Sequence, residues 1–305
     1  MLGFVLRRLA FAIPVLFGAT LLAFIVIRIV PGDPVTVLLN GRPTTPEVEA
    51  QLRHQFYLDR SMPMQYLLFL RDLSKGDLGL SMRSGNPVWT DISERLPATL
   101  RLTGAAFVLA MVFGLVLGLA GSFSQSRLLD RFLTFVQLVS VSIPPVWLGL
   151  LLLIVASFHY GWFPATGDEG WKTLVLPAIT LALPAGAVVG QVLRDGVRDV
   201  LGEQFVVTAR AKGLRERQIT IRHVLRNALI PVITVSGLIA GSLITGSVVI
   251  ETVFARPGVG RLAVDAITNK DTPVVMGIVL LAATTYVVIN ILVDLLYAIA
   301  DPRNR

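Results

Sequence analysis

The chain of 305 residues contains no cysteine and only three histidines. The absence of cysteine excludes disulfides, thiolate metal sites and cysteine nucleophiles, and it leaves the redox compartment undecided. Charged residues are also scarce, at 15% of the chain, against roughly 25% in soluble domains. Hydrophobic residues make up 54% and the mean hydropathy is +0.71. This composition excludes an ordinary soluble globular domain and predicts lipid as the solvent for most of the chain.

The residue types that nucleotide, metal and nucleophile sites require are missing or scattered. A P-loop ends in Gly-Lys-Ser/Thr, and no lysine of this chain follows a glycine. The histidines fall in three separate expected loops, at His54, His159 and His223, and no HExxH spacing occurs. We therefore expect no catalytic residue, no metal site and no cofactor bound by this chain.

One segment, Gly258 to Ala263, fits the G-x-G-x-x-G/A pattern of dinucleotide-binding folds. That pattern carries meaning only between a strand and a helix of a βαβ unit. Here it falls in a short link between two apolar runs, so we expect a tight turn that uses the backbone freedom of glycine.

Six runs without Asp, Glu, Lys or Arg are about as long as the 20 residues that span a bilayer core about 30 Å thick. They are Leu9 to Ile27, Leu102 to Phe123, Phe132 to Phe158, Thr173 to Leu193, Asn227 to Ile250 and Thr272 to Val293. The first run is longer than a signal-peptide core and leads into Pro31–Pro34 without a clear cleavage site, which favours a retained helix. The sequence predicts an all-α, polytopic membrane protein with six transmembrane helices.

Lysine and arginine in short loops indicate the orientation, because they stay on the cytoplasmic side. Fourteen of the 27 basic residues lie at the two ends of the chain and in the loops after the second and fourth runs, eight of them between Arg194 and Arg226. The opposite short loops are nearly neutral. Both termini are therefore expected in the cytoplasm, and the net charge of +7 requires no nucleic acid as a partner.

Residues 31–96 form the one long loop, on the extracytoplasmic side. Turns are expected at Asn40–Pro43 and Ser84–Pro87, and short helices over Val48–Tyr57, behind the cap Thr45-Pro46-Glu47, and over Met64–Leu73. A loop this long without structure would be unusual, so a small ordered subdomain is expected. The predicted organisation is a first transmembrane helix in residues 1–30, this subdomain in 31–96, and a five-helix core in 97–305.

The apolar runs hold no charge that could drive transport by protonation or ion ligation. Their deepest polar residues are Gln137, Asn290 and the near-terminal Asp294. For Asn290 and Asp294, hydrogen bonding between helices and an interfacial charge are the more ordinary roles. Energy for transport, if transport occurs, is expected from another subunit.

Small residues and prolines recur inside the runs. Two GxxxG pairs, Gly114/Gly118 and Gly237/Gly241, mark places where helices could approach closely. Prolines that free carbonyls and permit kinks stand at Pro14, Pro144, Pro145, Pro177, Pro184 and Pro231. Membrane helices tolerate both residue types, so any single position needs no function, whereas their number weakly favours a bundle that rearranges.

The cytoplasmic segment from Gln191 to Arg226 holds eight basic and four acidic residues with apolar positions between them. Gly213 interrupts it, which predicts two short helices joined by a turn. Such a segment suits docking into a groove of a soluble partner, and it is equally compatible with an ordinary cytoplasmic loop.

The order of several motifs resembles one family along nearly the whole chain. They are Leu6-Arg7-Arg8, Pro31–Pro34, Leu96–Leu100, Phe163–Gly167, Thr208–Leu214, Arg222–Pro231, Glu251–Leu262, Asn290, Asp294–Leu296 and Asp301–Arg303. Together they resemble the permeases of binding-protein-dependent ABC importers, in the DppB/OppB branch that imports peptides and, in some members, nickel or metal chelates and glutathione.

The resemblance implies a coupling, or EAA, loop within residues 191–228. The Glu-Ala-Ala of the general pattern is Val207-Thr208-Ala209 here, so the glutamate is absent and only Ala209 and Gly213 match. The residues implied to seat in an ATPase cleft are Gly202, Glu203, Ala209, Arg210, Ala211, Lys212, Gly213, Leu214 and Arg215. Gly213 would make the turn, with Arg210, Lys212 and Arg215 available for polar contacts.

The family further implies a homologous DppC/OppC-like second permease, two cytoplasmic ATPase subunits that bind ATP and Mg²⁺, and an extracytoplasmic solute-binding protein. We predict that residues 31–96 contribute to the surface on which the solute-binding protein docks. The location implied is a bacterial or archaeal cytoplasmic membrane, with lipid around the helices. Peptide is the expected cargo, and nickel, metal chelates, haem and glutathione stay open. The substrate path is not identified.

Two other classes of function remain as alternatives. A channel or secondary carrier would move substrate without ATPases, and uncharged spans disfavour it. A membrane enzyme would need clustered acids, bases or metal ligands near one interface, and the sequence contains no such cluster.

Overall fold

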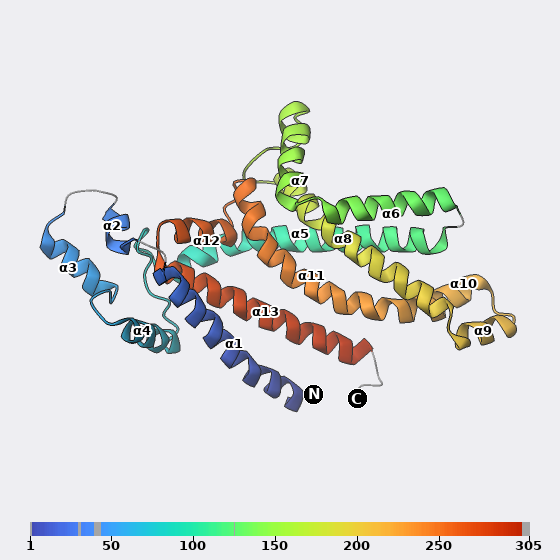
Figure 1. Cartoon of the computed structure of the whole chain (residues 1–305), viewed down its shortest axis with the longest axis horizontal. Coiled ribbons are helices and arrows are strands. Elements are labelled where there is room, and N and C mark those ends of the chain that lie inside the picture. The colour runs from blue at the N-terminus through green and yellow to red at the C-terminus, as the bar shows by residue number, and fades with distance from the viewer. Residues whose placement is uncertain (1, 30–31, 40–43, 125, 301–305) are drawn as a thin grey trace. The chain divides into compact units, whose positions relative to one another are not determined.

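The computed structural model of the chain describes residues 2–29, 32–39, 44–124 and 126–300 (Figure 1). The expected turn at Asn40–Pro43 and the closing motif Asp301–Arg303 lie outside the described residues, as does the side chain of Asp294. The elements are α1 (Leu2–Ile29), α2 (Pro34–Leu39), α3 (Pro46–Gln55), α4 (Met62–Ser74), α5 (Val88–Phe123), α6 (Arg127–Ser142), α7 (Pro145–Leu152), the π-helix η1 (Leu153–His159), α8 (Lys172–Leu201), α9 (Gln204–Ala211), α10 (Glu216–Gln218), the π-helix η2 (Ile219–Val224), α11 (Leu225–Val253), α12 (Val259–Thr268) and α13 (Thr272–Ala300). The predicted all-α class is confirmed.

Five stretches of helix are long and apolar enough to cross a membrane, in α1, α5, α8, the stretch that ends with α11, and α13. The expected third span, Phe132 to Phe158, is not one continuous helix. It is broken between α6 and α7 with a bend of 101°, because Pro144 and Pro145 follow the end of α6 at Ser142 and a proline has no N–H to continue a helix. By length and composition, the described residues thus hold five candidate spans, or six if this bent pair counts as one.

By contacts between residues, the chain forms two compact units. Unit 1 comprises residues 1–99 and 257–287, and unit 2 comprises residues 100–256 and 288–305. Both α5 and α13 contribute to each unit. The expected loop subdomain is therefore packed together with a later part of the chain, α12 and the first half of α13, within unit 1.

The short helices expected in residues 31–96 are present as α3 and α4, in unit 1. Pro46 and Pro63 stand in their first turns, where a missing N–H costs nothing. The expected turn at Ser84–Pro87 also forms, since Ser81 and Asn86 are joined by a backbone hydrogen bond of 2.9 Å and Gly85 has a φ of +72°.

A buried carboxylate fastens the loop before α5 to the segment before α13 in unit 1. Asp271 is 3% exposed and accepts hydrogen bonds from the Ser81 hydroxyl (2.6 Å) and from the backbone N–H groups of Met82 (3.1 Å) and Arg83 (3.2 Å). Because several donors share one carboxylate, its burial is compensated.

The segment Gly258 to Ala263 begins a helix, and the tight turn expected there is wrong. Gly258 is the N-cap of α12 with extended backbone angles (φ −99°, ψ 175°), and Gly260 lies inside α12. In the first turn of α12, the backbone N–H of Val259 donates a hydrogen bond to the Thr99 hydroxyl at 2.9 Å. The left-handed residue of this region is Ala255, with a φ of +48°.

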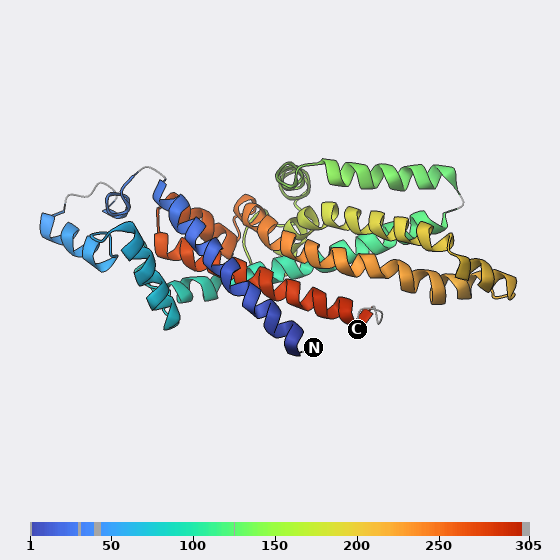
Figure 2. The ribbon, with the colours of Figure 1, turned by 60° about the horizontal axis from the view of Figure 1, so that its bottom comes forward.

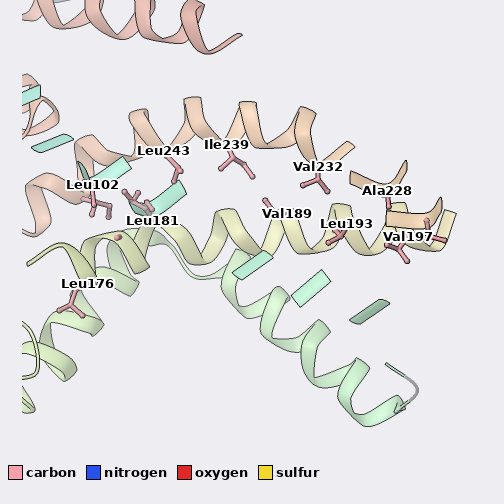
Figure 3. Close-up of a cluster of buried hydrophobic side chains, with 14 of the residues drawn as sticks. Leu102, Leu176, Leu181, Val189, Leu193, Val197, Ala228, Val232, Ile239 and Leu243 are labelled. Atoms are coloured by element: carbon pink, nitrogen blue, oxygen red, sulfur yellow. The ribbon is translucent and has the colours of Figure 1, made fainter. Parts of the chain in front are cut away.

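Helix α8 lies at the centre of unit 2 and packs against α6, α7 and α11. Figures 1 and 2 show α8 and α11 side by side over much of their lengths. They run antiparallel, since Gly196 faces Ala228 near one end of the pair and Gly246 faces Leu181 toward the other. Figure 3 shows buried aliphatic side chains of the two helices, among them Val189 and Leu193 of α8 and Val232, Ile239 and Leu243 of α11.

Glycines let the backbones of α5 and α8 touch, as the first GxxxG pair predicted. A Cβ on Gly114 would lie 2.5 Å from the Gly186 carbonyl oxygen, and one on Gly118 would lie 2.9 Å from that of Gly190. The second pair also marks a close approach, because a Cβ on Gly237 would collide with Val293 of α13.

Unit 2 also buries ionic groups that the apolar runs did not reveal. Arg256, 1% exposed, pairs with Asp168 and donates to the carbonyl oxygens of Gly167 (3.2 Å) and Thr173 (3.1 Å). Burial lowers the pKa of Arg256 below its usual value, and the charge of Asp168 opposes that shift. Glu251, expected in an outer loop, is fully buried in the last turn of α11.

Gly114→Ala should destabilise the protein, because its new Cβ meets backbone that cannot yield. Overpacking of this kind costs about 1–3 kcal/mol. Gly104→Ala in the same helix is the matched control, since nothing lies within 4 Å of a Cβ there. Thermal unfolding of the purified protein should show a lower Tm for Gly114→Ala alone, and equal Tm values would contradict the close contact.

Arg256→Ala should be far more damaging than Arg101→Ala, although both arginines pair with Asp168. Removing one partner of a buried pair costs about 3–5 kcal/mol, whereas an exposed pair contributes about 0–1 kcal/mol. The Arg101 side chain is 58% exposed and that of Arg256 is 2% exposed. Thermal unfolding measures the stability that each variant loses. Similar losses for the two variants would contradict the view that the buried Arg256 stabilises the fold.

Candidate functional site

The segment that connects α8 with α11 is a compact hairpin in unit 2. It contains α9, a turn, α10 and the π-helix η2. At its base a Cβ on Gly196 of α8 would lie 3.2 Å from the carbonyl oxygen of Ala228 in α11. Figure 3 shows Val197 and Ala228 close together at this end of the pair. The two helices that carry the segment are therefore in direct contact where it begins and ends.

One face of the hairpin belongs to the hydrophobic core of unit 2. Val206 of α9, together with Ile219 and Val224 of η2, is completely buried, and Ala209 is 6% exposed. The spacing of Val206 and Ala209 places both on one side of α9. Burying these side chains holds α9 against η2.

The turn after α9 is a Schellman motif centred on Gly213. Leu214 N–H donates to the Ala209 carbonyl (3.3 Å) and Gly213 N–H to the Arg210 carbonyl (2.9 Å), the two hydrogen bonds that define the motif. Gly213 has a φ of +74°, a left-handed conformation that glycine adopts without strain. The two short helices joined by a turn that the sequence predicted are thus confirmed.

The opposite face of the hairpin is exposed and carries both apolar and cationic groups. Phe205 and Val207 of α9 are 43% and 59% exposed, and Leu214 is 39% exposed. Basic side chains at Lys212 and Arg215 are exposed beside them. We call the exposed residues 202–205, 207, 208 and 210–217 the hairpin surface.

An ion pair braces the turn across its two sides. Arg210 Nε donates to Glu216 Oε1 at 2.8 Å, and a second contact of 3.4 Å joins Nη2 to Oε2. Hydrogen bonding to Glu216 raises the pKa of Arg210 above its usual value. Because both side chains are exposed, the pair contributes little stability. It does hold the Arg210 side chain toward Glu216.

The structure brings all nine residues predicted for this site together, with two qualifications. Gly202, Glu203, Ala211, Lys212, Gly213, Leu214 and Arg215 are exposed on the hairpin surface, whereas Ala209 faces the core. Arg210 is exposed and already paired with Glu216. The sequence-based set omitted Phe205 and Val207, and the signal that identifies them is the i, i+3 spacing of Val206 and Ala209, which leaves their neighbours outside.

A second polar contact ties α8 to the start of α6 near this end of the bundle. The buried Arg194 pairs with Asp130 and donates to the Thr134 hydroxyl at 2.8 Å. The buried polar residue Gln137 lies further along α6 and contacts α8 at Gly190.

No cluster of three His, Asp or Glu side chains that could hold a metal ion exists among the residues that the structure describes.

Comparison with solved structures gives the fold a context. The inward-facing MetNI methionine ABC transporter matches with a TM-score of 0.56 at 17% identity, over 69% of this chain and 96% of the matched chain. An amino acid ABC transporter crystallised with histidines matches with a TM-score of 0.52 at 19% identity, over 69% and 92%. At these identities the likeness concerns the fold alone.

Curated relatives match over the full length of the chain. The di/tripeptide permease DppB of Pseudomonas aeruginosa is 39% identical, and the dipeptide permease DppB of Escherichia coli K12 is 38% identical. The glutathione permease GsiC of Escherichia coli K12 is also 38% identical. In each case 100% of this chain and 99% of the relative are covered.

Two family profiles together account for nearly the whole sequence. The profile described as an N-terminal binding-protein-dependent transport system membrane component matches residues 1–103. The profile described as "Binding-protein-dependent transport system inner membrane component" matches residues 110–305. With the apolar helices and the bacterial relatives, these matches make the chain a multi-pass protein of the cytoplasmic membrane with a transport role. The chain belongs to the family of binding-protein-dependent transport system inner membrane components.

Proposed function

We propose that this chain is the permease subunit through which ATPase subunits drive the import of small peptides, and that the hairpin surface is where an ATPase docks. The proposal rests on one observation, namely that one face of the hairpin is buried and the other is exposed. Its inner residues Val206 and Ala209 are part of the core, while its outer residues offer Phe205, Val207 and exposed cations. An exposed apolar group beside charges is typical of a protein interface.

The same geometry supports a mechanical role for the hairpin. Its ends continue into α8 and α11, which touch at Gly196 and Ala228. A partner that pulls on α9 therefore acts on both helices at once. ATP binding closes the partner ATPases, and the docked hairpin passes that motion to a packed bundle that switches between two arrangements.

The proposed topology has six crossings with both termini in the cytoplasm, counting the bent pair α6 and α7 as one crossing. The eight basic residues between Arg194 and Arg226 favour a cytoplasmic hairpin. Residues 31–96 then lie on the extracytoplasmic side, where α3 is available to a solute-binding protein. None of the α3 side chains is buried, which fits a docking role.

The proposed partners are a homologous second permease, two cytoplasmic ATPase subunits and the solute-binding protein. ATP and Mg²⁺ are assigned to the ATPases, since this chain contains no P-loop. The path for cargo is assigned to the space between the two permeases. ATP hydrolysis is thus a property of the complex and not of this chain.

Small peptides are the proposed cargo because two relatives of 38–39% identity are named as permeases for di- or tripeptides. Glutathione, itself a tripeptide, is the second candidate, favoured by the relative named as its permease at 38% identity. Metal chelates and haem are weaker candidates without such support.

The test is uptake into proteoliposomes that contain the purified complex, with its solute-binding protein outside and ATP inside. We expect labelled di- and tripeptides to accumulate only with ATP and the binding protein, and glutathione and nickel chelates to accumulate less. Gly213→Val should reduce uptake at least tenfold while the complex still assembles, because a β-branched residue is strained at a φ of +74°.

Gly213→Asn is the matched control, since asparagine adopts the left-handed conformation more readily and should retain most of the uptake. Normal transport by the complex that carries Gly213→Val would contradict the role of the turn. Uptake by this chain alone, without ATPases, would overturn the proposed function in favour of a channel or secondary carrier.

A further inference from the structure

Helix α4 lies against the apolar helix α1, well inside the stretch that crosses the membrane. The Tyr66 hydroxyl of α4 is 3.0 Å from the Thr20 hydroxyl and donates to the Phe17 carbonyl at 3.2 Å. Phe17 is 12 residues before the end of α1 at Ile29, which is about 18 Å at 1.5 Å per residue. Part of the expected extracytoplasmic loop therefore reaches the depth of the hydrocarbon.

The contact between the two helices is specific and well packed. Tyr66 is 7% exposed, with its ring 5.4 Å from that of Phe24 and 5.7 Å from that of Phe17. Nearer the end of α1, Arg28 donates to the amide oxygen of the buried Gln65. Figure 1 shows α1 and α4 within the same part of the chain's fold, and the contacts above place α4 against the side of α1.

The exposed side chains of α4 are apolar in its first half and polar in its second. Met62, Met64 and Leu67 are 57%, 47% and 58% exposed. Further along, Arg71 is exposed and pairs with Asp72. Such exposure of large apolar groups is a liability in water, whereas it suits a helix whose apolar half contacts lipid.

An apolar groove of about 500 Å³ separates this half of α4 from α1. Its walls include Leu21, Ile25 and Ile29 of α1 and Met62, Pro63 and Leu67 of α4. The groove continues the exposed apolar surface of α1, where Leu22, Ile25 and Val26 are 65%, 47% and 53% exposed. A surface of this kind on a membrane helix faces lipid tails.

We propose that α4 is embedded in the membrane, and that the groove between α1 and α4 holds an acyl chain of a phospholipid from the surrounding leaflet. The depth of Tyr66, the apolar half of α4 and the continuity with α1 each support lipid as the occupant. This proposal for α4 and the groove rests on the membrane location of the chain and not on the proposed cargo. If α4 lies in the membrane, a solute-binding protein cannot reach it. The helix α3 then remains available for docking.

The test uses nitroxide labels and power-saturation EPR on the assembled complex in lipid nanodiscs. The chain has no cysteine, so Leu67→Cys and, separately, Met64→Cys give one label each in this chain, provided that the partner subunits carry no reactive cysteine. Leu22→Cys on α1 is the lipid-exposed control, and Glu47→Cys on α3 is the aqueous control.

At positions 64 and 67 we expect collisions with oxygen to exceed those with a water-soluble nickel chelate several-fold, as at position 22. Phospholipids that carry a nitroxide on the acyl chain should broaden the spectra at both positions. Chelate accessibility equal to that at position 47 would overturn the proposal, because α4 would then lie in water. Low accessibility to both reagents would also overturn it, since a partner subunit would then cover the groove.

Discussion

Backbone contact between α5 and α8 is the constraint on which unit 2 depends. Helices in lipid gain no hydrophobic energy from meeting one another, so close van der Waals packing must hold them together. Gly114 and Gly118 on α5 face Gly186 and Gly190 on α8 with no room for a side chain. With α5 held this close, α8 also packs on α6, α7 and α11. In the proposed coupling, these contacts of α8 carry force from its end into the bundle.

The hairpin between α8 and α11 gains its rigidity from the same arrangement. A loop of ordinary composition would be free to move at its ends, whereas this one buries Val206, Ile219 and Val224 in the core. Its Schellman turn satisfies the last carbonyls of α9 and reverses the chain. The outcome is a projection whose outer residues are exposed and whose inner residues are buried, which fits the proposed transmission of motion from an ATPase to the membrane helices.

Ionic groups fix the loops that join the spans. Arg256 draws together Gly167, Asp168 and Thr173, so two motifs far apart in the sequence, Phe163–Gly167 and Glu251–Leu262, meet in space. In unit 1, Asp271 does the same for the loop before α5. Arg256 and Asp271 both have polar partners, and these partners offset part of the desolvation free energy of the buried charges.

The sequence alone predicted much of this structure, and the misses have physical causes. Runs of about 20 apolar residues located the long helices, and Gly213, which interrupts the cytoplasmic segment, located the hairpin turn. Composition could not show that Pro144 and Pro145 bend a span by 101°, because proline permits a kink without setting its angle. The apolar runs left Glu251 and Arg256 in the short loop between the last two of them, and the sequence could not show their burial. For Arg256, the partners come from a distant segment, residues 167–173. The lipid-facing side of α4 was equally hidden, because its apolar residues resemble those of any amphipathic helix.

The measurement that tests the central claim most directly is site-specific photocrosslinking in membranes from cells that produce the whole complex. A benzophenone amino acid at position 205, on the hairpin surface, should form an adduct with an ATPase subunit. The same residue at position 128, where Leu128 of α6 is 79% exposed, should not. An ATPase adduct at 205 alone is the predicted result. Its absence from 205, or equal adducts at both positions, would contradict the account of the hairpin as the docking site.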